Sequence, residues 1–215
     1  MSHTPEPGRQ CGAMAGLRLF TSNRMEILID ELAETLRAPL ADPLMREVVL
    51  VQSRGMQRWV SMELARRHGV CANVDFPFPN RFVYAVFRSS VKDLPEESPF
   101  EPANLTWKVM GVLPDCLEKE GFESLKAYLG DGLSDLKLFQ LSSRIADLFD
   151  QYLTFRPDMI LQWERGRESH WQAALWREIT KKKDKTHRAR LLRAFLDDPP
   201  PSLPGLPGRL AVFGI

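Results

Sequence analysis

The sequence contains few cysteines, and none of them has the spacing of a metal ligand. Cys11, Cys71 and Cys116 lie far apart, without a CxxC motif or the histidine-flanked spacing of a zinc site. A disulfide framework and a zinc site are therefore not expected, and we predict three reduced thiols. No metal and no other cofactor is predicted.

Long apolar runs are also missing. No stretch approaches the roughly 20 residues that a membrane helix requires, and residues 1–16 lack the apolar segment of a signal peptide. We therefore expect a cytoplasmic protein that does not associate with membranes. With 44% apolar residues in a chain of 215, the sequence can still bury a sizeable core in one or two domains.

Charge is nearly balanced over the whole chain but not along it. The formal net charge is +1, whereas residues 181–193 (KKKDKTHRARLLR) carry seven Lys or Arg against one Asp, a local charge of +6. Such a run is typical of a solvated face or a mobile loop. Clustered cations also release counterions when they meet nucleic acid, so a phosphate-contacting patch is the alternative.

The first part of the chain has the pattern of a parallel α/β domain. Residues 1–16 are predicted to form a disordered or extended tail. Strands are expected at 17–20, 48–51 and 73–76, with helices at 24–37 and from 54 to about 68. Asn23 and Glu26 have the spacing of a capping box, while Ser53 and Gly69 are predicted to begin and end the second helix. The loops that follow such strands form the usual ligand edge.

A helical segment follows and is itself followed by a last strand. FPFPNRF (76–82) is predicted to be a rigid turn before a further helix, and from about residue 93 to 196 the periodicity is helical, most clearly at 137–153. RLAVFGI (209–215) is predicted to return to the first sheet. We therefore expect an α/β domain at 17–95 plus 203–215, and an inserted helical subdomain with linker at 96–202. Because a strand stands at the last residue, we expect that the chain is cut from a longer one.

RLFTSNRMEIL (18–28) places a strand, a polar turn and a helix where nucleotide-binding proteins place their phosphate loop. The glycines and the lysine of such a loop are missing, and Thr21, Ser22, Asn23 and Arg24 stand in their place. The carboxylates that would hold a metal after a later strand are also missing, since Gly214 stands there. We predict a degenerate nucleotide loop without ATP hydrolysis, although a helix N-terminus can attract an anion weakly.

Polar and aromatic side chains near the same edge point to nucleic acid. QSRGMQR (52–58) puts Gln52, Arg54 and Arg58 at a strand end and a helix start. At such a position these side chains could contact the phosphate backbone or a base edge of a nucleic acid. The rings that could stack on bases are those of Phe78, Tyr84 and Trp59, although core packing is the favoured interpretation of Trp59.

No convincing catalytic set is present. His68 and Cys71 lack a third member of a nucleophile set and are interpreted as structural, and His170 and His187 are isolated in the sequence. The helix at 137–153 carries a polar stripe that is typical of a salt-bridged solvated face, consisting of Arg144, Asp147, Asp150 and Gln151.

Five blocks of the chain resemble the gamma subunit of exodeoxyribonuclease V, the RecC family, and occur in the same order. They are LRLFTSNRMEIL, VLVQSRGMQRWVSMELARRHGVCANVDFPFPNRFVYAVF, LTWKVMGVLPDCLE, LKLFQLSSRIADLFDQYLTFRPDMILQWE and LPGRLAVFGI. The resemblance spans nearly everything from Leu17 to Ile215. It implies a parallel-sheet, superfamily 1 helicase-like α/β domain with a degenerate P-loop and an inserted all-helical subdomain.

The resemblance also implies a role and partners. The gamma subunit is a non-catalytic part of an ATP-dependent helicase–nuclease complex for double-strand break repair, together with the beta and alpha subunits. It helps to split forked DNA and guides the 3′-ended single strand through a channel where a regulatory sequence can be recognised. The implied DNA-binding residues are Gln52, Arg54, Arg58, Phe78, Tyr84, Asp147, Leu148, Asp150, Gln151 and Arg156. Among them, Arg54, Arg58, Phe78 and Tyr84 depart from the residue types associated with enterobacterial members.

Two alternatives stay open. One is an atypical nucleotide-binding enzyme of the doubly wound class, which would need ATP-dependent stabilisation or turnover. The other is a protein-interaction scaffold in which residues 181–193 and the helical subdomain bind a partner. Loss of DNA binding on charge reversal at Arg54 and Arg58 would count against the scaffold.

Overall fold

The computed structural model describes residues 16–42, 44–130, 134–181, 186–203 and 205–214. The chain divides into two compact units, which are described separately below. We call Met1–Phe78 with Pro207–Ile215 the α/β unit, and Pro79–Leu206 the helical unit. Of the tail predicted at 1–16, all but Gly16 lies outside the described residues.

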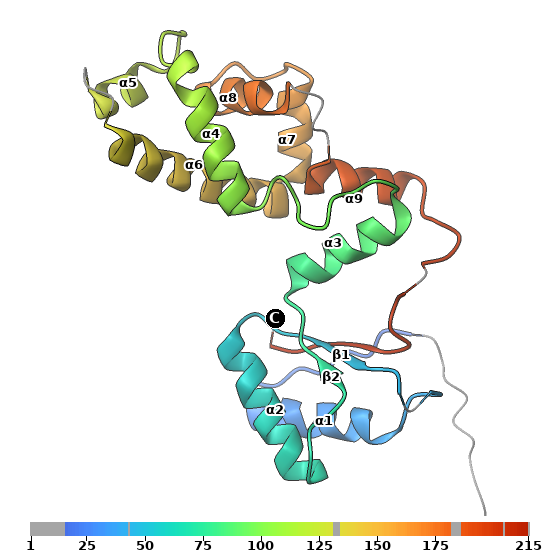
Figure 1. Ribbon diagram of the computed structural model, residues 1–215. Coiled ribbons are helices and arrows are strands. Elements are labelled where there is room, and N and C mark those ends of the chain that lie inside the picture. The colour runs from blue at the N-terminus through green and yellow to red at the C-terminus, as the bar shows by residue number, and fades with distance from the viewer. Residues whose placement is uncertain (1–15, 43, 131–133, 182–185, 204, 215) are drawn as a thin grey trace, which may run out of the picture. The chain divides into compact units, whose positions relative to one another are not determined.

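The α/β unit is built on a small parallel sheet (Figure 1). Its strands are β1 (Glu47–Leu50), β2 (Val74–Asp75) and β3 (Leu210–Val212), and its helices are α1 (Met25–Arg37) and α2 (Arg54–His68). The strand order is β2-β1-β3, and β1 pairs in parallel with both neighbours, so that Val48 faces Asp75 on one side and Leu210 on the other. The predicted α/β class and the predicted return of the last segment to the first sheet are confirmed.

Both predicted ends of α2 are confirmed, because they rest on local side-chain chemistry. The Oγ of Ser53 accepts a hydrogen bond from the backbone N–H of Met56 at 3.1 Å, which satisfies one of the free donors of the first turn. At the other end, Gly69 adopts a left-handed backbone with φ of 84°. A residue with a Cβ adopts that conformation only at a cost, so the glycine ends the helix here.

The predictions for the segment before α1 are wrong. The residue that precedes α1 is Arg24, without a side-chain cap, so the capping box expected of Asn23 and Glu26 does not form. Instead, Ser22 Oγ accepts a hydrogen bond from the Arg24 N–H at 3.1 Å and shapes the turn. Residues 17–20 form no strand in the described sheet, since a strand needs a neighbour for its backbone and a core for its side chains. Leu17 is 96% exposed.

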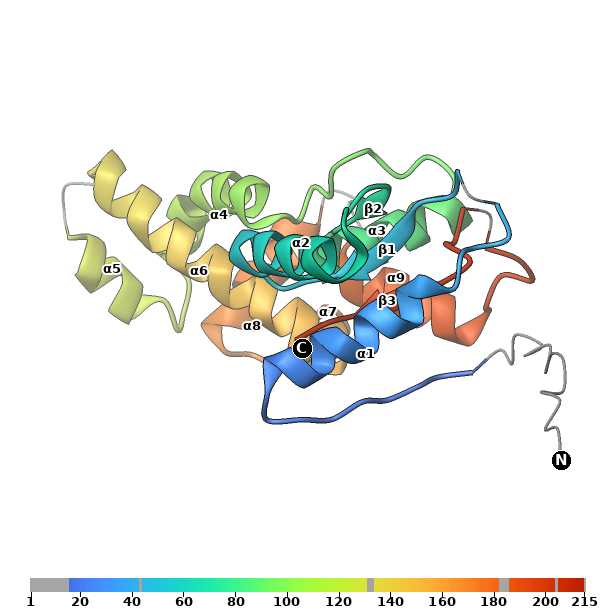
Figure 2. The same cartoon turned by 90° about the horizontal axis from the view of Figure 1, so that it is seen from below.

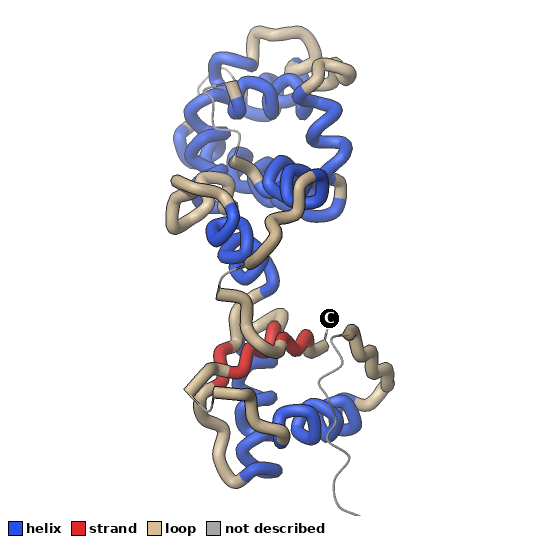
Figure 3. Tube along the Cα trace, turned by 90° about the vertical axis from the view of Figure 1, so that its right-hand side faces the viewer, coloured by secondary structure: helices blue, strands red, loops and turns tan. Residues whose placement is uncertain are grey.

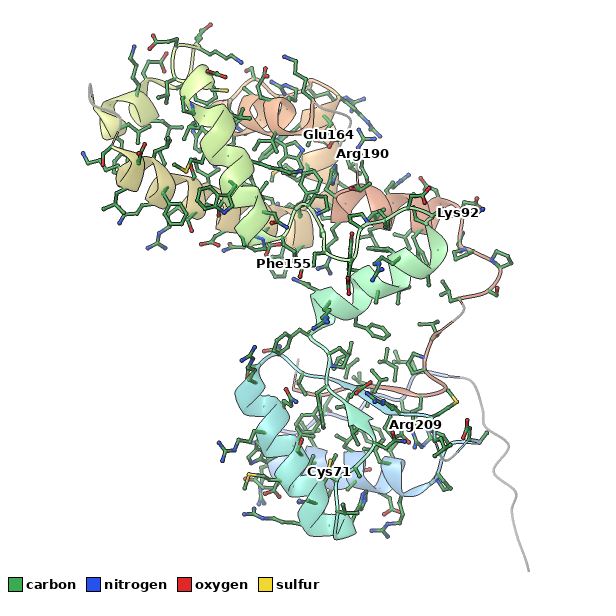
Figure 4. All side chains as sticks on the ribbon, viewed as in Figure 1. Cys71, Lys92, Phe155, Glu164, Arg190 and Arg209 are labelled. Atoms are coloured by element: carbon green, nitrogen blue, oxygen red, sulfur yellow. The ribbon has the colours of Figure 1, made fainter. Side chains whose placement is uncertain are left out.

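The core of the α/β unit lies between the sheet and its two helices. Its buried side chains are Ile29, Leu32, Ala33, Val49, Val51, Val60, Leu64 and Phe213. Arg209, which precedes β3, donates to Glu47 of β1 and to the backbone carbonyls of Thr35 and Ala38 (Figure 4). The return of the chain is therefore held by apolar packing and by a guanidinium group that donates four hydrogen bonds.

The described part of the helical unit contains helices and no strand (Figure 3). The helices are α3 (Pro79–Ser90), α4 (Pro102–Cys116), α5 (Glu123–Leu129), α6 (Asp135–Phe155), α7 (Pro157–Glu164), α8 (Trp171–Thr180) and α9 (Arg188–Asp197). α4 crosses α6 and packs on it (Figures 1 and 2), and α8 packs on α4 and α7. Large rings fill the core, with Phe149, Trp163 and Trp176 almost completely buried.

The position of α3 bears on the domain boundaries. Residues up to 95 are predicted from the sequence to belong to the α/β domain, whereas in the structure α3 belongs to the helical unit. The ring of Phe87 in α3 packs edge-on against Phe195 of α9, with centroids 5.9 Å apart. Within the helical unit, α3 therefore packs on α9.

Candidate nucleic-acid interface

The loops after the strands of the α/β unit meet at one edge. Gly214, just after β3, lies beside the first turns of both helices, and a Cβ at this position would be 3.4 Å from Met56 Cε and 3.6 Å from Met25 Cε. TSNR (21–24) and QSRG (52–55) therefore sit at the same edge. Methionine methyl groups stand where a nucleotide-hydrolysing enzyme would need carboxylates to hold a metal.

The TSNR loop provides few groups that could bind a phosphate. Thr21, Asn23 and Arg24 are exposed, and Ser22 uses its hydroxyl to shape the turn. Arg24 and Glu26 form an ion pair at 3.9 Å between two side chains that are each 66% exposed, which is worth little in water. That this loop is a degenerate nucleotide loop stays a prediction.

The first turn of α2 presents positive charge to solvent. Gln52, Arg54 and Arg58 are all exposed, and the first turn contains no acidic residue. Within the described chain, neither arginine forms an ion pair. A helix N-terminus carries a partial positive charge of its own, so the first two turns of α2 combine two exposed cations with free backbone donors. Such an arrangement suits a phosphate group.

The three predicted stacking rings differ in their environments. Trp59 is half-buried and packs against Phe213 with centroids 6.0 Å apart, so the core interpretation of this residue is confirmed. Phe78, between two prolines, is 38% exposed and can offer a ring face. Tyr84 is half-buried and its hydroxyl donates to the carbonyl of Pro95 at 3.1 Å.

The remaining predicted DNA-binding residues lie in α6 or directly after it. Asp147, Gln151 and Arg156 are exposed, whereas Leu148 and Asp150 are half-buried. The salt-bridged face suggested by Arg144, Asp147 and Asp150 is not observed, because no ion pair joins these side chains in the described structure. The exposed Asp147 carboxylate and Gln151 amide are therefore available to other partners.

Asp150 belongs to a cluster of charges inside the helical unit. Burial raises the pKa of Asp150, the charge of Arg188 opposes this, and Asp147 adds to it. Burial also lowers the pKa of Arg188, which Asp150 and Glu101 partly offset. Asp150 and Tyr84 line the same small pocket, so the structure brings these two predicted site residues together.

Three described cations of the basic run at 181–193 pair with acidic side chains of the same unit. Lys181 pairs with Glu178 at 3.2 Å, Arg190 with Glu164 at 2.5 Å and Arg193 with Asp197 at 2.9 Å. Residues 182–185 lie outside the described residues. Lys181 and Arg193 are 73% and 61% exposed, so the solvated-face interpretation fits at these two positions, whereas Arg190 reaches the buried Glu164. The phosphate patch stays a prediction.

The isolation predicted for His187 is wrong. His187 is completely buried, and its Nε2 lies 2.6 Å from Oε1 of Glu164, whose other oxygen accepts from Arg190 Nε at 2.6 Å (Figure 4). Sequence spacing could not reveal this network, because its members come from α7, the segment before α9 and α9 itself. By contrast, the structural interpretation of His68 fits, since Nε2 lies 3.1 Å from the Ala33 carbonyl oxygen.

Cys71 is also structural. The thiol is half-buried, and burial raises its pKa, so the reactive thiolate is disfavoured at neutral pH. Cys71 and Cys116 are both free cysteines. In the part of the chain that is described, no group of three or more His, Cys, Asp or Glu side chains could hold a metal ion, and no helix is long and apolar enough to cross a membrane.

The predicted DNA-binding residues thus form two separate sets. Gln52, Arg54, Arg58 and Phe78 belong to the α/β unit, and Tyr84, Asp147, Leu148, Asp150, Gln151 and Arg156 belong to the helical unit. The first set is cationic and aromatic, which suits phosphates and base faces. The second is rich in carboxylate and amide oxygens, which suit the amino groups of base edges.

Comparison with known proteins identifies a family. Residues 17–215 match the family described as RecC, N-terminal domain. RecBCD enzyme subunit RecC of Escherichia coli (strain K12) is 41% identical, over 93% of this chain and 19% of its own length. The protein of the same name from Haemophilus influenzae is 33% identical over 92% of this chain, and that of Mycolicibacterium smegmatis is 30% identical over 92%. The chain spans about a fifth of the length of these relatives.

Proposed function

Since the chain belongs to the RecC family, we propose that it is the N-terminal, DNA-guiding part of a non-catalytic subunit in an ATP-dependent helicase–nuclease complex. In this role it helps to split the duplex at a double-strand break, guides the 3′-ended strand and contributes to sensing a regulatory sequence in the cytoplasm. Its partners are the beta and alpha subunits of an exodeoxyribonuclease V-like enzyme, together with single-stranded and forked DNA.

The observation that carries the proposal is the first turn of α2. Arg54 and Arg58 are exposed at the carboxyl edge of a parallel sheet, which is the edge where such folds place their ligands. Neither has an acidic partner in the described structure, so both are available to phosphates. Keeping two unpaired cations near a helix N-terminus is electrostatically unfavourable, and a bound polyanion removes that cost.

We further propose that the α/β unit is a superfamily 1 helicase-like domain that has lost its ATPase chemistry. The support is the order of strand and helix, the TSNR loop without glycine or lysine, and the methionines beside Gly214. This chain then has neither ATPase nor nuclease activity of its own. A rise in melting temperature with magnesium-ATP that is absent with magnesium alone would contradict this part of the proposal and favour a nucleotide-binding enzyme.

The test of DNA binding is a fluorescence-anisotropy titration of the 215-residue chain with single-stranded and forked DNA at two salt concentrations. Binding should weaken with salt, with a slope of about −0.7 for each phosphate neutralised on a single strand. The Arg54→Glu, Arg58→Glu double variant should lose most of the affinity and reduce the slope by roughly one to two phosphates.

A matched control makes the result specific. The Arg37→Glu, Arg66→Glu variant changes the net charge equally, at exposed arginines that already pair with Glu34 and Glu63. We expect it to bind DNA almost as the unchanged chain does. If both double variants lose affinity equally, the effect is one of net charge, and the assignment to the first turn of α2 is wrong. If the unchanged chain binds no DNA, the scaffold alternative gains support.

A further inference from the structure

The exposed face of α3 carries basic side chains and no acidic one. Residues 79–92 contain Arg81, Arg88 and Lys92 but neither Asp nor Glu, so this segment has a local charge of +3. All three residues are exposed, and none of them forms an ion pair within the described residues. The charge of α3 is therefore not balanced within the helix or by a bound side chain from another element.

Helical spacing puts the two arginines on the side of α3 that faces away from its packing partner. Arg81, Ala85 and Arg88 are separated by four and three positions, so they lie on one face of the helix, and all three are exposed. Phe87 is the buried residue of α3 and packs against Phe195 of α9. The basic face is thus presented to solvent and does not take part in the core.

Lys92 extends this face beyond the last turn. The N–H of Val91 still donates to the carbonyl of Phe87 at 2.8 Å, so the helical path continues past Ser90. Lys92 follows Arg88 by four positions at that end of α3 (Figure 4). We call Arg81, Arg88 and Lys92 the basic row. At 1.5 Å per residue it is about 16 Å long, which matches about five phosphates of one DNA strand at 3.4 Å each.

The helix dipole explains one of the arginines but not the other. Cations near the C-terminus of a helix are stabilised by its dipole, which suits Arg88 in the last turn. Arg81 stands in the first turn, where the dipole favours acidic side chains, and that turn contains none. A cation at this position is electrostatically unfavourable for the helix alone, and a bound anion offsets that cost.

The acidic residues that follow α3, within 93–97, belong to a segment that crosses a different side of the helix. The carbonyl of Pro95 in this segment accepts a hydrogen bond from the Tyr84 hydroxyl at 3.1 Å. The charge of Glu97 helps to raise the pKa of Glu101, which lines the same small pocket as Tyr84. No ion pair joins this segment to the basic row in the part of the chain that the structure describes. The row therefore keeps its positive charge.

We propose that the basic row of α3 is a track for the phosphate backbone of DNA, held without contact to the bases. The exposed positions between the cations are Ala85 and Ser89, whose small side chains allow a backbone to approach closely. Charge complementarity favours a polyanion here, and phosphate contacts of this kind fix the position of DNA without reading its sequence. The inference rests on the proposed function and adds contacts outside the ten residues implied by family resemblance.

An acidic protein is the competing partner, and the basic row lacks what such an interface needs. Protein interfaces are centred on buried apolar or aromatic anchors that are depleted in charge. The face of α3 that carries the row has only Ala85 and Ser89 between its cations, and no exposed aromatic residue. A partner with regularly repeated negative charge, such as a DNA backbone, therefore fits this face better.

The experiment titrates the 215-residue chain with labelled single-stranded DNA, and with a duplex of the same length, over a range of salt concentrations. Arg81→Glu, Arg88→Glu should lower the salt slope on the single strand by roughly 0.7 to 1.4, which corresponds to one or two phosphates. A matching loss should appear with the duplex, because both DNAs have phosphates. A loss confined to the single strand would mean contact with bases and would overturn the phosphate track.

Two further variants make the result specific. Arg81→Lys, Arg88→Lys keeps both charges and should keep the salt slope. Lys126→Glu, Lys137→Glu makes the same change in net charge as the double glutamate variant, at exposed lysines of α5 and α6 in the same unit, and should bind DNA as the unchanged chain does. Equal losses in this control and in Arg81→Glu, Arg88→Glu would reduce the effect to net charge and refute the track.

A second readout needs no variant. Lys92 should react more slowly with an acylating reagent when the unchanged chain is saturated with DNA, as measured by mass spectrometry of its peptides. Lys126, which pairs with Glu118 in another part of the unit, should react equally with and without DNA. If DNA protects neither lysine, the basic row is not on the path of the strand and the proposal is wrong.

The outcomes separate this inference from the proposed function. If Arg81→Glu, Arg88→Glu binds DNA with an unchanged slope while Arg54→Glu, Arg58→Glu loses binding, the track is refuted and the proposed function stands. Failure of the unchanged chain to bind any DNA refutes both. If the α3 variant binds DNA normally but no longer associates with the partner subunits, the basic row is a protein interface and the phosphate track is overturned.

Discussion

Oε1 of Glu164 and Nε2 of His187 are 2.6 Å apart, although 23 positions separate the two residues in the chain. The Glu164 side chain is only 7% exposed and also accepts hydrogen bonds from Arg190 and, at 3.3 Å, from Trp176 Nε1. The His187 ring lies edge-on between Phe100 and Trp176. One carboxylate therefore joins α7, α8 and α9 inside an aromatic core.

Removal of this carboxylate should destabilise the helical unit strongly. Glu164→Ala leaves the buried His187 and the partly exposed Arg190 without their acceptor, and an unsatisfied buried polar group costs about 1–3 kcal/mol. Urea unfolding of the helical unit, followed by circular dichroism, measures the loss. Glu118→Ala is the control, because that glutamate is 77% exposed and its ion pair with Lys126 contributes little. Equal midpoints for the two variants would show that the network does not stabilise the fold.

Stability should also fall in acid because of Glu164. Burial alone would raise the pKa of Glu164, but hydrogen bonds and charges from His187 and Arg190 outweigh it and hold the pKa below the ordinary value of 4.5. A carboxyl with a lowered pKa contributes stability that is complete above pH 4.5 and is lost as the pH falls through the folded value. Between pH 5 and pH 3 the unchanged chain should therefore lose stability more steeply than Glu164→Gln. Parallel pH profiles would contradict this expectation.

Asp150 should behave in the opposite way. Its pKa is raised above 3.8, mainly by burial, so the folded state binds the proton more tightly than the unfolded chain does. Stability therefore falls as the pH rises above 3.8, and Asp150→Asn should raise the unfolding midpoint at pH 7 with little effect at pH 3. The comparison variant is Asp158→Asn, at an exposed position in α7 of the same unit. A loss of stability in Asp150→Asn at pH 7 would mean that its attraction to Arg188 dominates instead.

The N-cap of α2 should matter to the α/β unit. Ser53→Ala removes the acceptor for the Met56 N–H, which typically costs about 1 kcal/mol. Ser53→Asp keeps an acceptor and should retain the stability. Trp59 is the only tryptophan between residues 1 and 78, so its fluorescence reports on this unit. Unchanged unfolding of Ser53→Ala, judged by that signal, would show that the cap is not important.

Local signals in the sequence predicted much of the α/β unit. The strand β1, the Ser53 cap and the Gly69 ending of α2 depend on residues within a few positions of each other, and all three are found. The capping box at Asn23 failed although it has the correct spacing, because the chain before α1 turns through Ser22 instead. Spacing identifies candidates for a cap, but the path of the incoming chain decides between them.

Contacts between distant segments could not be predicted from local sequence patterns. The sequence predicted a solvated run or a phosphate patch at 181–193, whereas Arg190 reaches back to Glu164, 26 positions earlier. For the nucleic-acid interface, the exposure of Arg54 and Arg58 agrees with their predicted position at a strand end and helix start. The roles of all ten proposed contacts stay predictions, because exposure permits binding without demonstrating it.

The pairing of β3 with β1 has a consequence for synthesis on the ribosome. Val49 and Ala211 are neighbours in the sheet, yet 161 residues lie between them, and the helical unit at 79–206 is translated in that interval. The nascent chain thus completes every described helix before the third strand exists. The backbone groups of β1 that pair with β3 therefore have no strand partner there until β3 leaves the exit tunnel.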